Sequence, residues 1–343
     1  MIYSPPNLKN KERNKTMKKF VAILLTLMLV LGVSAAFATE AEVPPTTAPT
    51  YTDQGTVTIQ KVYKLINAGT TSPEETFTLV QVGNGTVTDG DATSAPALGT
   101  ITGADFAAGA ATVNGATGTI TVALPAYEKV GIYEYTLKEV AGTTAGVTYY
   151  GNNIKLVVTV INDGEGKIRV AAVHTESEGG TKSDTFENTY SAGTLNVSKT
   201  VTGNLGDESK YFEFKVTLTG VEGKTYGTSY AVTGGTNTAN PNAIKIGEET
   251  TFLLKHGETI HIANLPYGVS YTVTETAATG YTTTKIGDTG TINAADQTAA
   301  FTNNKTGEID MGVTTENLPY VLLIGFVVLA GAALLLKRKA HNN

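Results

Sequence analysis

The stretch Thr194–Val201, with the sequence TLNVSKTV, alternates apolar and polar side chains as a β-strand does. Successive side chains of a strand point to opposite faces of its sheet, so Leu195 and Val197 share one face with Lys199. The two apolar residues predict that this face is buried. Because an unpaired buried charge is costly, Lys199 needs polar partners from elsewhere in the chain.

The stretch Thr56–Val62, with the sequence TVTIQKV, repeats this pattern and places Lys61 on one face with Val57 and Ile59. Most of the remaining sequence consists of short alternating runs separated by Gly, Asn, Asp and Pro. Helical periodicity is almost absent from the middle of the chain. Such a pattern is typical of all-β sandwiches. The length of 343 residues favours two domains with additional segments.

The composition narrows the possible functions. The net charge is −6 and no basic stretch is interleaved with aromatic residues, so nucleic acid is not an expected partner. The sequence shows no Walker motif and no nucleophile elbow, and its histidines lack the spacing of metal ligands. We therefore expect no cofactor and no metal site. The chain contains no Cys, so it cannot form disulfides.

The N-terminal region has the layout of a secretion signal. A basic start at Lys18-Lys19 precedes the apolar run Phe20–Val33, and an A-x-A cleavage pattern follows. We expect a signal peptide over residues 1–38, of which residues 1–16 are polar and could reflect an upstream start that is not used. Residues 39–53 are rich in Pro and Thr and predict a flexible or extended leader.

The C-terminal region predicts a membrane anchor. The apolar run Leu318–Leu336 approaches the roughly 20 residues that a transmembrane helix requires. The basic cluster Lys337-Arg338-Lys339 follows at once and marks the cytoplasmic side. The bulk of the chain is then expected outside the cell.

The middle of the sequence contains an internal repeat that we assign to two domains, residues 54–190 and 191–305. Segments of the first domain match segments of the second in the same order. The matched pairs are TVTIQK (56–61) with TLNVSK (194–199), ETFTLVQV (75–82) with KYFEFKVTL (210–218), LPAYEKVGIYEYTLKEV (124–140) with LPYGVSYTVTET (265–276), and DTFENTY (184–190) with AAFTNNK (299–305).

The period of two predicts further polar side chains on the buried faces. Glu139 shares a face with Tyr135 and Leu137, and Asn188 shares a face with Phe186. In the second domain the same rule points Glu275 and Asn303 inward. Each domain is thus expected to bury one Lys, one Glu and one Asn. Lys64 and Asn304 are close neighbours with the opposite parity.

Two interpretations of these trios remain open. The first is a buried Lys–Glu pair that is hydrogen-bonded to Asn, which gains little net stability because desolvation offsets attraction. The second is covalent chemistry, because burial favours a neutral amine and a protonated carboxyl group. A neutral lysine could attack the Asn carboxamide while Glu stabilises the oxyanion and transfers protons.

That reaction would release ammonia and leave an isopeptide bond. The proposed trios are Lys61–Glu139–Asn188 and Lys199–Glu275–Asn303, in which Glu139 and Glu275 are the proton shuttles. Holding the groups together makes a very slow bimolecular reaction unimolecular. Because each site would react once, the chain is not expected to be an enzyme.

These motifs together resemble the backbone pilins of Gram-positive bacteria, in particular the two-domain streptococcal T-antigen type. The shared order is an inward Lys, then Y-x-L-x-E or Y-x-V-x-E, then F-x-N. The likeness covers roughly residues 54–340 and is strongest in Phe252–Thr276. It implies two tandem immunoglobulin-like (CnaB-like) β-sandwiches between an N-terminal signal helix and a C-terminal transmembrane helix, with self-forming Lys–Asn isopeptide bonds.

The resemblance also implies a structural subunit of a pilus, secreted to the cell surface, transiently anchored in the membrane and polymerised by a pilin-type sortase. Lys182 matches the position of the lysine that links subunits. Residues 306–343 match a sorting signal without the usual L-P-x-T-G. The aligned cleavage candidates are Met311 and Gly312, with Thr306 and Gly307 as the alternative.

The implied partners are other pilin copies, the sortase, peptidoglycan, and minor pilins or a tip adhesin. The alternative is a non-polymerising adhesin or stalk protein that is anchored to the cell wall and built from the same domains.

Overall fold

The structure is a computed structural model that describes residues 54–308, 320, 322–324 and 327. The predicted signal peptide and leader lie outside the described residues, as do Met311, Gly312 and most of the predicted membrane span. Among the described residues, no helix is long and apolar enough to cross a membrane.

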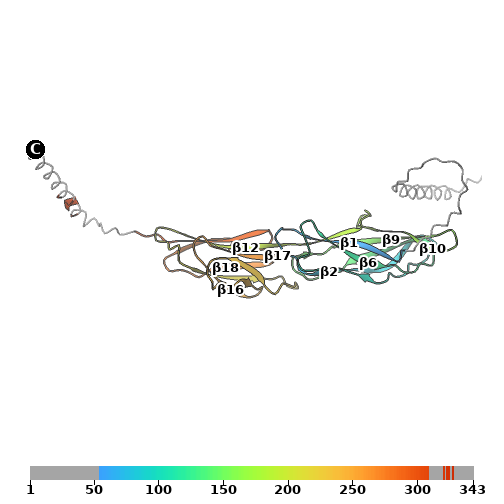
Figure 1. The fold of residues 1–343 in the computed structure, drawn as a ribbon, viewed down its shortest axis with the longest axis horizontal. Helices are drawn as coiled ribbons and strands as arrows, with labels where there is room; N and C mark the ends of the chain where they lie inside the picture. Colours follow the sequence, from blue (N-terminus) through green and yellow to red (C-terminus); the bar gives the residue numbers. More distant parts are fainter. Residues whose placement is uncertain (1–53, 309–319, 321, 325–326, 328–343) are drawn as a thin grey trace, which may run out of the picture. The chain divides into compact units, whose positions relative to one another are not determined.

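The first β-sandwich is built from a five-stranded and a four-stranded sheet around one hydrophobic core (Figure 1). The five-stranded sheet has the order β4 (Ile101–Thr102), β6 (Ala116–Ala123), β1 (Thr56–Leu65), β11 (Thr185–Tyr190), β8 (Val147–Thr148). The four-stranded sheet has the order β10 (Ile168–Glu176), β9 (Asn153–Asn162), β7 (Gly131–Glu139), β3 (Leu79–Gly90). A separate pair consists of β2 (Glu75–Phe77) and β5 (Ala104–Phe106).

The second β-sandwich combines a six-stranded and a four-stranded sheet around its own core. The six-stranded sheet has the order β15 (Ala243–Ile244), β14 (Tyr230–Gly234), β17 (Thr259–Pro266), β12 (Ala192–Thr202), β21 (Asp296–Asn304), β19 (Thr282–Ile286). The four-stranded sheet has the order β16 (Glu249–Leu254), β13 (Phe212–Thr219), β18 (Ser270–Glu275), β20 (Thr289–Thr291).

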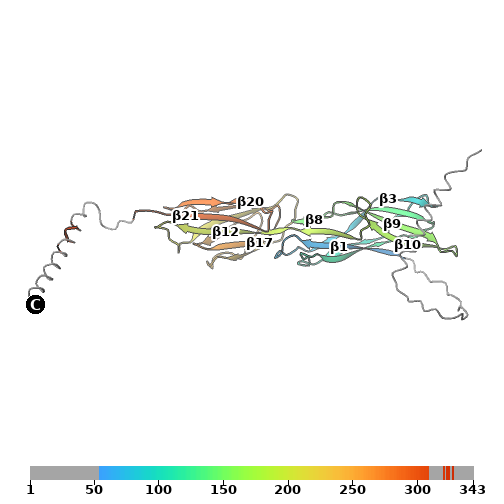
Figure 2. The same cartoon turned by 90° about the horizontal axis from the view of Figure 1, so that it is seen from above.

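In each sandwich the first long strand pairs in parallel with the last. Strand β1 pairs with β11, and β12 pairs with β21, whereas the other strand pairs are antiparallel. Figure 2 shows β21, β12 and β17 side by side in the second sandwich. Each parallel pair brings the two ends of a domain's sequence together.

Alternation of exposed and buried residues runs through these strands as the sequence pattern predicts. In β1, every second residue from Val57 onward is buried, and Lys61 occupies one of these positions. In β12, Lys199 stands between the buried Val197 and Val201. The predicted all-β fold of two tandem immunoglobulin-like sandwiches is confirmed, whereas the signal helix and the membrane helix stay predictions.

The second core offers a direct test of this alternation. Phe252 is 0% exposed and faces Phe214 across the β13–β16 pair, whereas the adjacent Thr251 is exposed on the opposite face. Phe252→Ala should lower the free energy of unfolding by about 3–5 kcal/mol because it removes a buried ring and leaves a cavity. Thr251→Ala should change it by less than about 0.5 kcal/mol. Urea unfolding measures both, and equal effects would contradict the assigned faces.

Candidate functional site

The two lysines singled out by the sequence lie on central strands and are buried. Lys61 belongs to β1, which lies between β6 and β11, and it is 1% exposed. Lys199 belongs to β12, which lies between β17 and β21, and it is also 1% exposed. A central strand has neighbours on both sides, so an inward side chain of this kind has no route to solvent along the sheet.

The parallel register brings each Asn close to its Lys. Lys61 is paired with Phe186, and Asn188 follows two residues later on the same face of β11. In the second sandwich Lys199 is paired with Phe301, and Asn303 follows at the same offset. The F-x-N motif thus places its Phe opposite the lysine in the register and its Asn two residues further along the same face.

Each glutamate comes from the opposite sheet of its sandwich. Glu139 is the last residue of β7, and Glu275 is the last residue of β18. The carboxylates of both residues are almost fully buried, with side-chain exposures of 0% and 2%. Both sandwiches therefore build the site in the same way, with Lys and Asn from one sheet and Glu from the other.

In the first site all three side chains contact one another. The Nζ of Lys61 donates to the carboxylate of Glu139 and, at 2.7 Å, to the Oδ1 of Asn188. The Nδ2 of Asn188 donates to the Oε1 of Glu139. The amine, the carboxyl group and the carboxamide thus form a closed triangle of hydrogen bonds.

In the second site the carboxylate is the common partner. The Nζ of Lys199 lies 2.9 Å and 3.0 Å from the two carboxylate oxygens of Glu275. The Nδ2 of Asn303 donates to the Oε1 of Glu275. Lys199 and Asn303 are thus held by the same carboxylate.

Aromatic rings surround both lysine tips and exclude water. The Nζ of Lys61 lies 5.4 Å from the ring centre of Phe77 and 5.7 Å from that of Tyr150. The Nζ of Lys199 lies 4.2 Å from the ring centre of Phe212. Burial lowers the pKa of both lysines, and the neighbouring glutamates oppose this effect only in part.

Lys64 and Asn304, whose side chains point to the opposite face of their strands, lie outside the two sites. Lys64 is partly exposed and is 3.8 Å from Glu187 on the outside of the first sandwich. Asn304 is exposed and donates to the side chain of Thr202. The structure thus brings together the three residues of each predicted trio and keeps Lys64 and Asn304 apart from them.

This arrangement can support two kinds of chemistry. It is a buried ion pair with an amide partner, and it also presents a nucleophile, an acid–base group and an acyl carbon within contact distance. Among the described residues, no group of His, Cys, Asp and Glu side chains could hold a metal ion.

One participant was not visible in the sequence. The main-chain N–H of Tyr150, in the loop after β8, donates to the Oδ1 of Asn188 at 2.8 Å. Side-chain alternation predicts where side chains point but not where the amides of a loop point. No motif in the sequence could have identified this contact.

The lysine proposed to link subunits is accessible. Lys182 is exposed in the turn between β10 and β11 and forms an isolated bridge with Glu176. It lines a groove of about 400 Å³ together with Val57, His174 and Asp184. The alternative cleavage candidates Thr306 and Gly307 follow β21, and Gly307 is held by hydrogen bonds with the side chain of Asn204.

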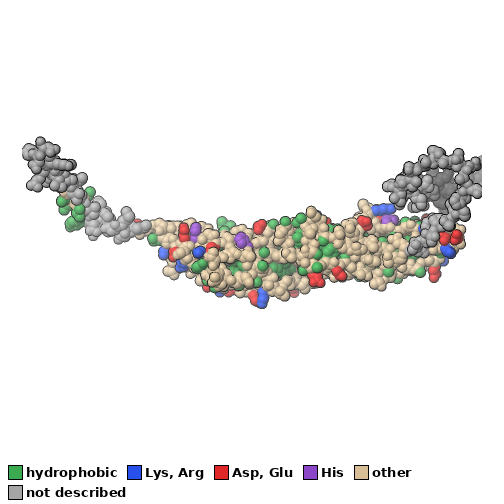
Figure 3. All heavy atoms as spheres, in the orientation of Figure 1, with side chains coloured by type: hydrophobic (Ala, Val, Ile, Leu, Met, Phe, Trp, Pro, Cys, Tyr) green, Lys and Arg blue, Asp and Glu red, His purple; other side chains and the backbone are tan. Residues whose placement is uncertain are grey.

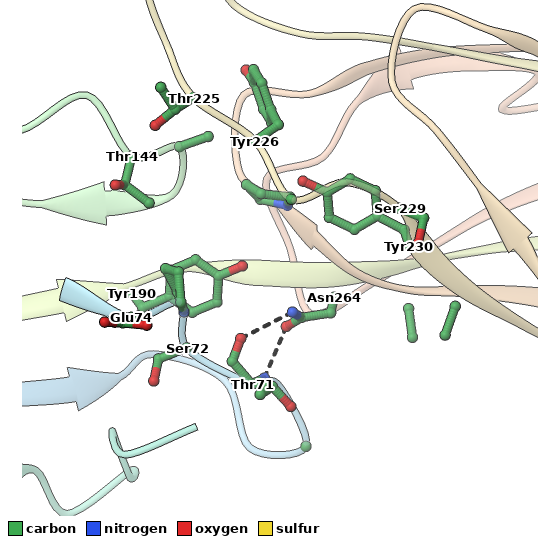
Figure 4. Close-up of a pocket in the computed structure, with 17 residues that line it drawn as sticks. Thr71, Ser72, Glu74, Thr144, Tyr190, Thr225, Tyr226, Ser229, Tyr230 and Asn264 are labelled. Carbon is green, nitrogen blue, oxygen red and sulfur yellow. Dashed lines mark hydrogen bonds between the residues drawn. The ribbon is translucent and has the colours of Figure 1, made fainter. Parts of the chain in front are cut away.

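A pocket with a volume of about 590 Å³ is lined by loop residues that include Thr71, Tyr226 and Asn264 (Figure 4). The main-chain N–H of Thr71 donates to the Oδ1 of Asn264, and the Nδ2 of Asn264 donates back to the carbonyl of Thr71. Asn264 is in the left-handed region, with φ 59°. Glu74 is the only carboxylate among the described lining residues, so the pocket lacks a paired-carboxylate site.

The charged side chains of both signs are mixed on the face drawn in Figure 3. On the face drawn in Figure 3, the Lys and Arg side chains of the described residues are scattered among polar and apolar ones. Acidic side chains are interspersed with them. The described residues of this face therefore form no continuous basic patch.

Comparisons with known proteins agree with this architecture. Residues 57–191 match a family model described as a Spy0128-like isopeptide containing domain, and residues 193–305 match one described as a domain of unknown function. The chain is 31% identical over 237 residues to a pilin of Streptococcus pyogenes serotype M1, a match that covers 62% of this chain and 69% of that protein. The chain belongs to the family of Gram-positive backbone pilins. The predicted resemblance is thereby confirmed.

Two further relatives extend the comparison. The crystal structure of the major pilin from Streptococcus pyogenes has a TM-score of 0.52 and 26% identity, and the match covers 75% of this chain and 100% of that one. The pilus tip adhesin Cpa of Streptococcus pyogenes is 33% identical over 129 residues, which are 36% of this chain but only 18% of the adhesin. Membership of the pilin family makes this chain a structural subunit of a pilus.

The lowered pKa of Lys61 predicts a pH dependence of stability when no cross-link is present. An Asn188→Ala variant cannot form the cross-link and keeps Lys61 as a free amine. At pH values below the ordinary lysine pKa of 10.5, the unfolded chain of this variant binds the lysine proton more tightly than the folded chain does. The free energy of unfolding should therefore rise as the pH increases toward 10.5, by at most about 1.4 kcal/mol per pH unit. Urea unfolding at several pH values measures this slope.

The control is the variant that combines Lys61→Met, Glu139→Leu and Asn188→Ala, which removes the titratable pair. Its free energy of unfolding should lack this rise. The same slope in both variants would assign the pH dependence to other groups.

Proposed function

We propose that this chain is the backbone subunit of a surface pilus and that each of its sandwiches is closed by an autocatalytic Lys–Asn isopeptide bond. The observation that carries the proposal is the repeated trio of amine, carboxyl group and carboxamide, buried among aromatic rings in both sandwiches. A stabilising ion pair does not require an Asn at the same place twice, whereas amide formation does.

The reaction balances without any cofactor. The neutral Nζ of Lys61 attacks the Cγ of Asn188, the new C–N bond forms, and the bond from Cγ to Nδ2 breaks. Glu139 takes a proton from Nζ and gives one to Nδ2, which leaves as ammonia. Lys199, Glu275 and Asn303 perform the same step in the second sandwich. The product amide is uncharged, so the cost of burying two charges disappears.

The bonds explain how such a subunit carries tension. Each one joins a residue of the first long strand to a residue of the last, across the parallel pair that already connects them. A pulling force then passes through the covalent link, and the strands between its ends are not unravelled. By analogy with disulfides, closing a loop of about 100 residues contributes on the order of 4–5 kcal/mol. This fills the role that cysteines cannot play in this chain.

We further propose that a pilin-type sortase polymerises the chain. The exposed Lys182, beside its groove, is the acceptor for the C-terminal acyl group of the next copy. Cleavage in the segment that contains Met311 and Gly312, or at Thr306 and Gly307, would supply that group. The polymer is then attached to peptidoglycan at the cell surface, with minor pilins or a tip adhesin as further partners.

A second candidate function is a non-polymerising adhesin or stalk anchored to the cell wall. The similarity to the tip adhesin Cpa favours this alternative, because an adhesin can carry related sequence within a longer chain. Both candidates use the same internal bonds, so the bonds do not distinguish them. The covalent state of the protein in wall extracts does.

The mass of the mature protein tests the internal bonds. It should be lower than the mass calculated from the sequence by two ammonia molecules. Glu139→Ala should restore the mass of one ammonia molecule and Glu275→Ala that of the other, because each removes one proton shuttle. Intact-mass spectrometry makes the measurement, and Glu187→Ala, an exposed acid on β11, is the control that should leave both bonds formed. A wild-type mass equal to the calculated mass would refute both bonds.

Wall extracts test the polymer. After heating in detergent, immunoblots of the wild type should show a ladder of covalent multimers, and Lys182→Arg should reduce it to the monomer because the acceptor amine is lost. Lys167→Arg, at another exposed lysine, should keep the ladder. A single wild-type band would favour the adhesin or stalk function, and a ladder that persists in Lys182→Arg would assign the linkage to another lysine.

A further inference from the structure

The two sites match in their side chains but differ at the carbonyl oxygen of the reacting Asn. In the first site the Oδ1 of Asn188 accepts from the Nζ of Lys61 at 2.7 Å and from the main-chain N–H of Tyr150 at 2.8 Å. In the second site the Oδ1 of Asn303 is buried and has no hydrogen-bond partner within the described part of the chain. An unpartnered buried carbonyl is uncommon, because buried polar atoms are normally satisfied.

The Tyr150 amide is placed where negative charge would develop. Attack on the Cγ of Asn188 turns its carbonyl oxygen into an oxyanion, which a fixed N–H donor stabilises. The same N–H lies 3.3 Å from the Oε1 of Glu139, so it faces both the acyl oxygen and the proton shuttle. The Tyr150 ring packs edge-on against Phe186, with the ring centres 5.1 Å apart, which fixes the loop that carries this amide.

The difference follows from the strand next to the Asn-bearing strand. In the first sandwich β8 is short and pairs with β11 only at Thr189 and Tyr190, so it ends before it reaches Asn188. The chain then leaves the sheet, and the Tyr150 amide is free to point at the carboxamide. In the second sandwich β19 continues past this level and pairs Thr283 with Asn303. The backbone beside Asn303 is thus part of the β19–β21 ladder, and no main-chain N–H of the described residues donates to its Oδ1.

We propose that the main-chain N–H of Tyr150 is a catalytic group of the first site, and that the first sandwich consequently closes faster than the second. This inference rests on the proposed isopeptide chemistry and adds the donor that holds the oxyanion. In this geometry Glu139 contacts the leaving Nδ2 and the attacking Nζ, which suits proton transfer, while Tyr150 contacts the oxygen. Removal of one oxyanion donor typically slows an acyl transfer by about 10²–10³-fold.

The test replaces the N–H without changing the side chain. The full-length chain is synthesised in a cell-free system in which nonsense suppression inserts the α-hydroxy acid analogue of tyrosine at position 150. An ester oxygen then stands in place of the N–H. After a labelling pulse, samples are quenched in acidic denaturant and digested, and mass spectrometry quantifies the peptides cross-linked through Lys61–Asn188 and Lys199–Asn303.

The expected result is that closure of the first site slows by about 10²-fold or more, while the second site of the same molecules closes at its wild-type rate. The second site is an internal control for folding and for the quality of the translation. Unchanged closure of the first site in the ester variant overturns the role of the Tyr150 amide.

The wild-type chain supplies an independent measurement. Its Lys61–Asn188 peptide should accumulate at least about 10-fold faster than its Lys199–Asn303 peptide, because only the first carbonyl oxygen has a donor. Equal rates or the reverse order contradict the inference even if the ester variant fails to fold. If neither cross-linked peptide forms in the wild type, the proposed function itself fails, which separates that outcome from a failure of this inference.

Discussion

The structure depends on a lysine amine that lies in the apolar interior of each sandwich beside a carboxyl group and a carboxamide. Taking a charge out of water is costly, and pairing it with a buried carboxylate offsets that cost only in part. The surrounding rings of Phe77, Tyr150 and Phe212 worsen the balance by excluding water. The same burial that makes the arrangement costly as an ion pair lowers the pKa of the amine and makes it a better nucleophile.

The shared topology of the two sandwiches explains why the same arrangement occurs in both. A parallel pair between the first long strand and the last brings together residues that are 127 positions apart in the first sandwich. Glu139 at the end of β7, or Glu275 at the end of β18, comes from the opposite sheet and contacts the lysine and the asparagine. The proposed covalent bond at this place would join the two ends of a domain, which is where a fibre under tension needs it. Family membership and mechanical logic therefore agree on a pilus subunit.

The repeated site is also where the two sandwiches differ. Strand β8 ends before it reaches Asn188, and the Tyr150 N–H after it donates to the Asn188 side chain, whereas β19 pairs with β21 at Asn303. A difference of a few residues in the length of a neighbouring strand thus changes the environment of the Asn carbonyl oxygen without changing any of the three reacting side chains. Two sites with the same side chains need not react at the same rate.

The sequence by itself determined the all-β fold, the two repeated halves and the inward faces of Lys61, Glu139 and Asn188 and of their counterparts, because a period of two fixes the face of every side chain in a strand. Only the tertiary structure decided which strands pair in parallel and how close the three groups lie, since both depend on long-range pairing. It alone revealed the Tyr150 amide, because the direction of a loop N–H follows from the path of the backbone and leaves no mark in the pattern of side chains.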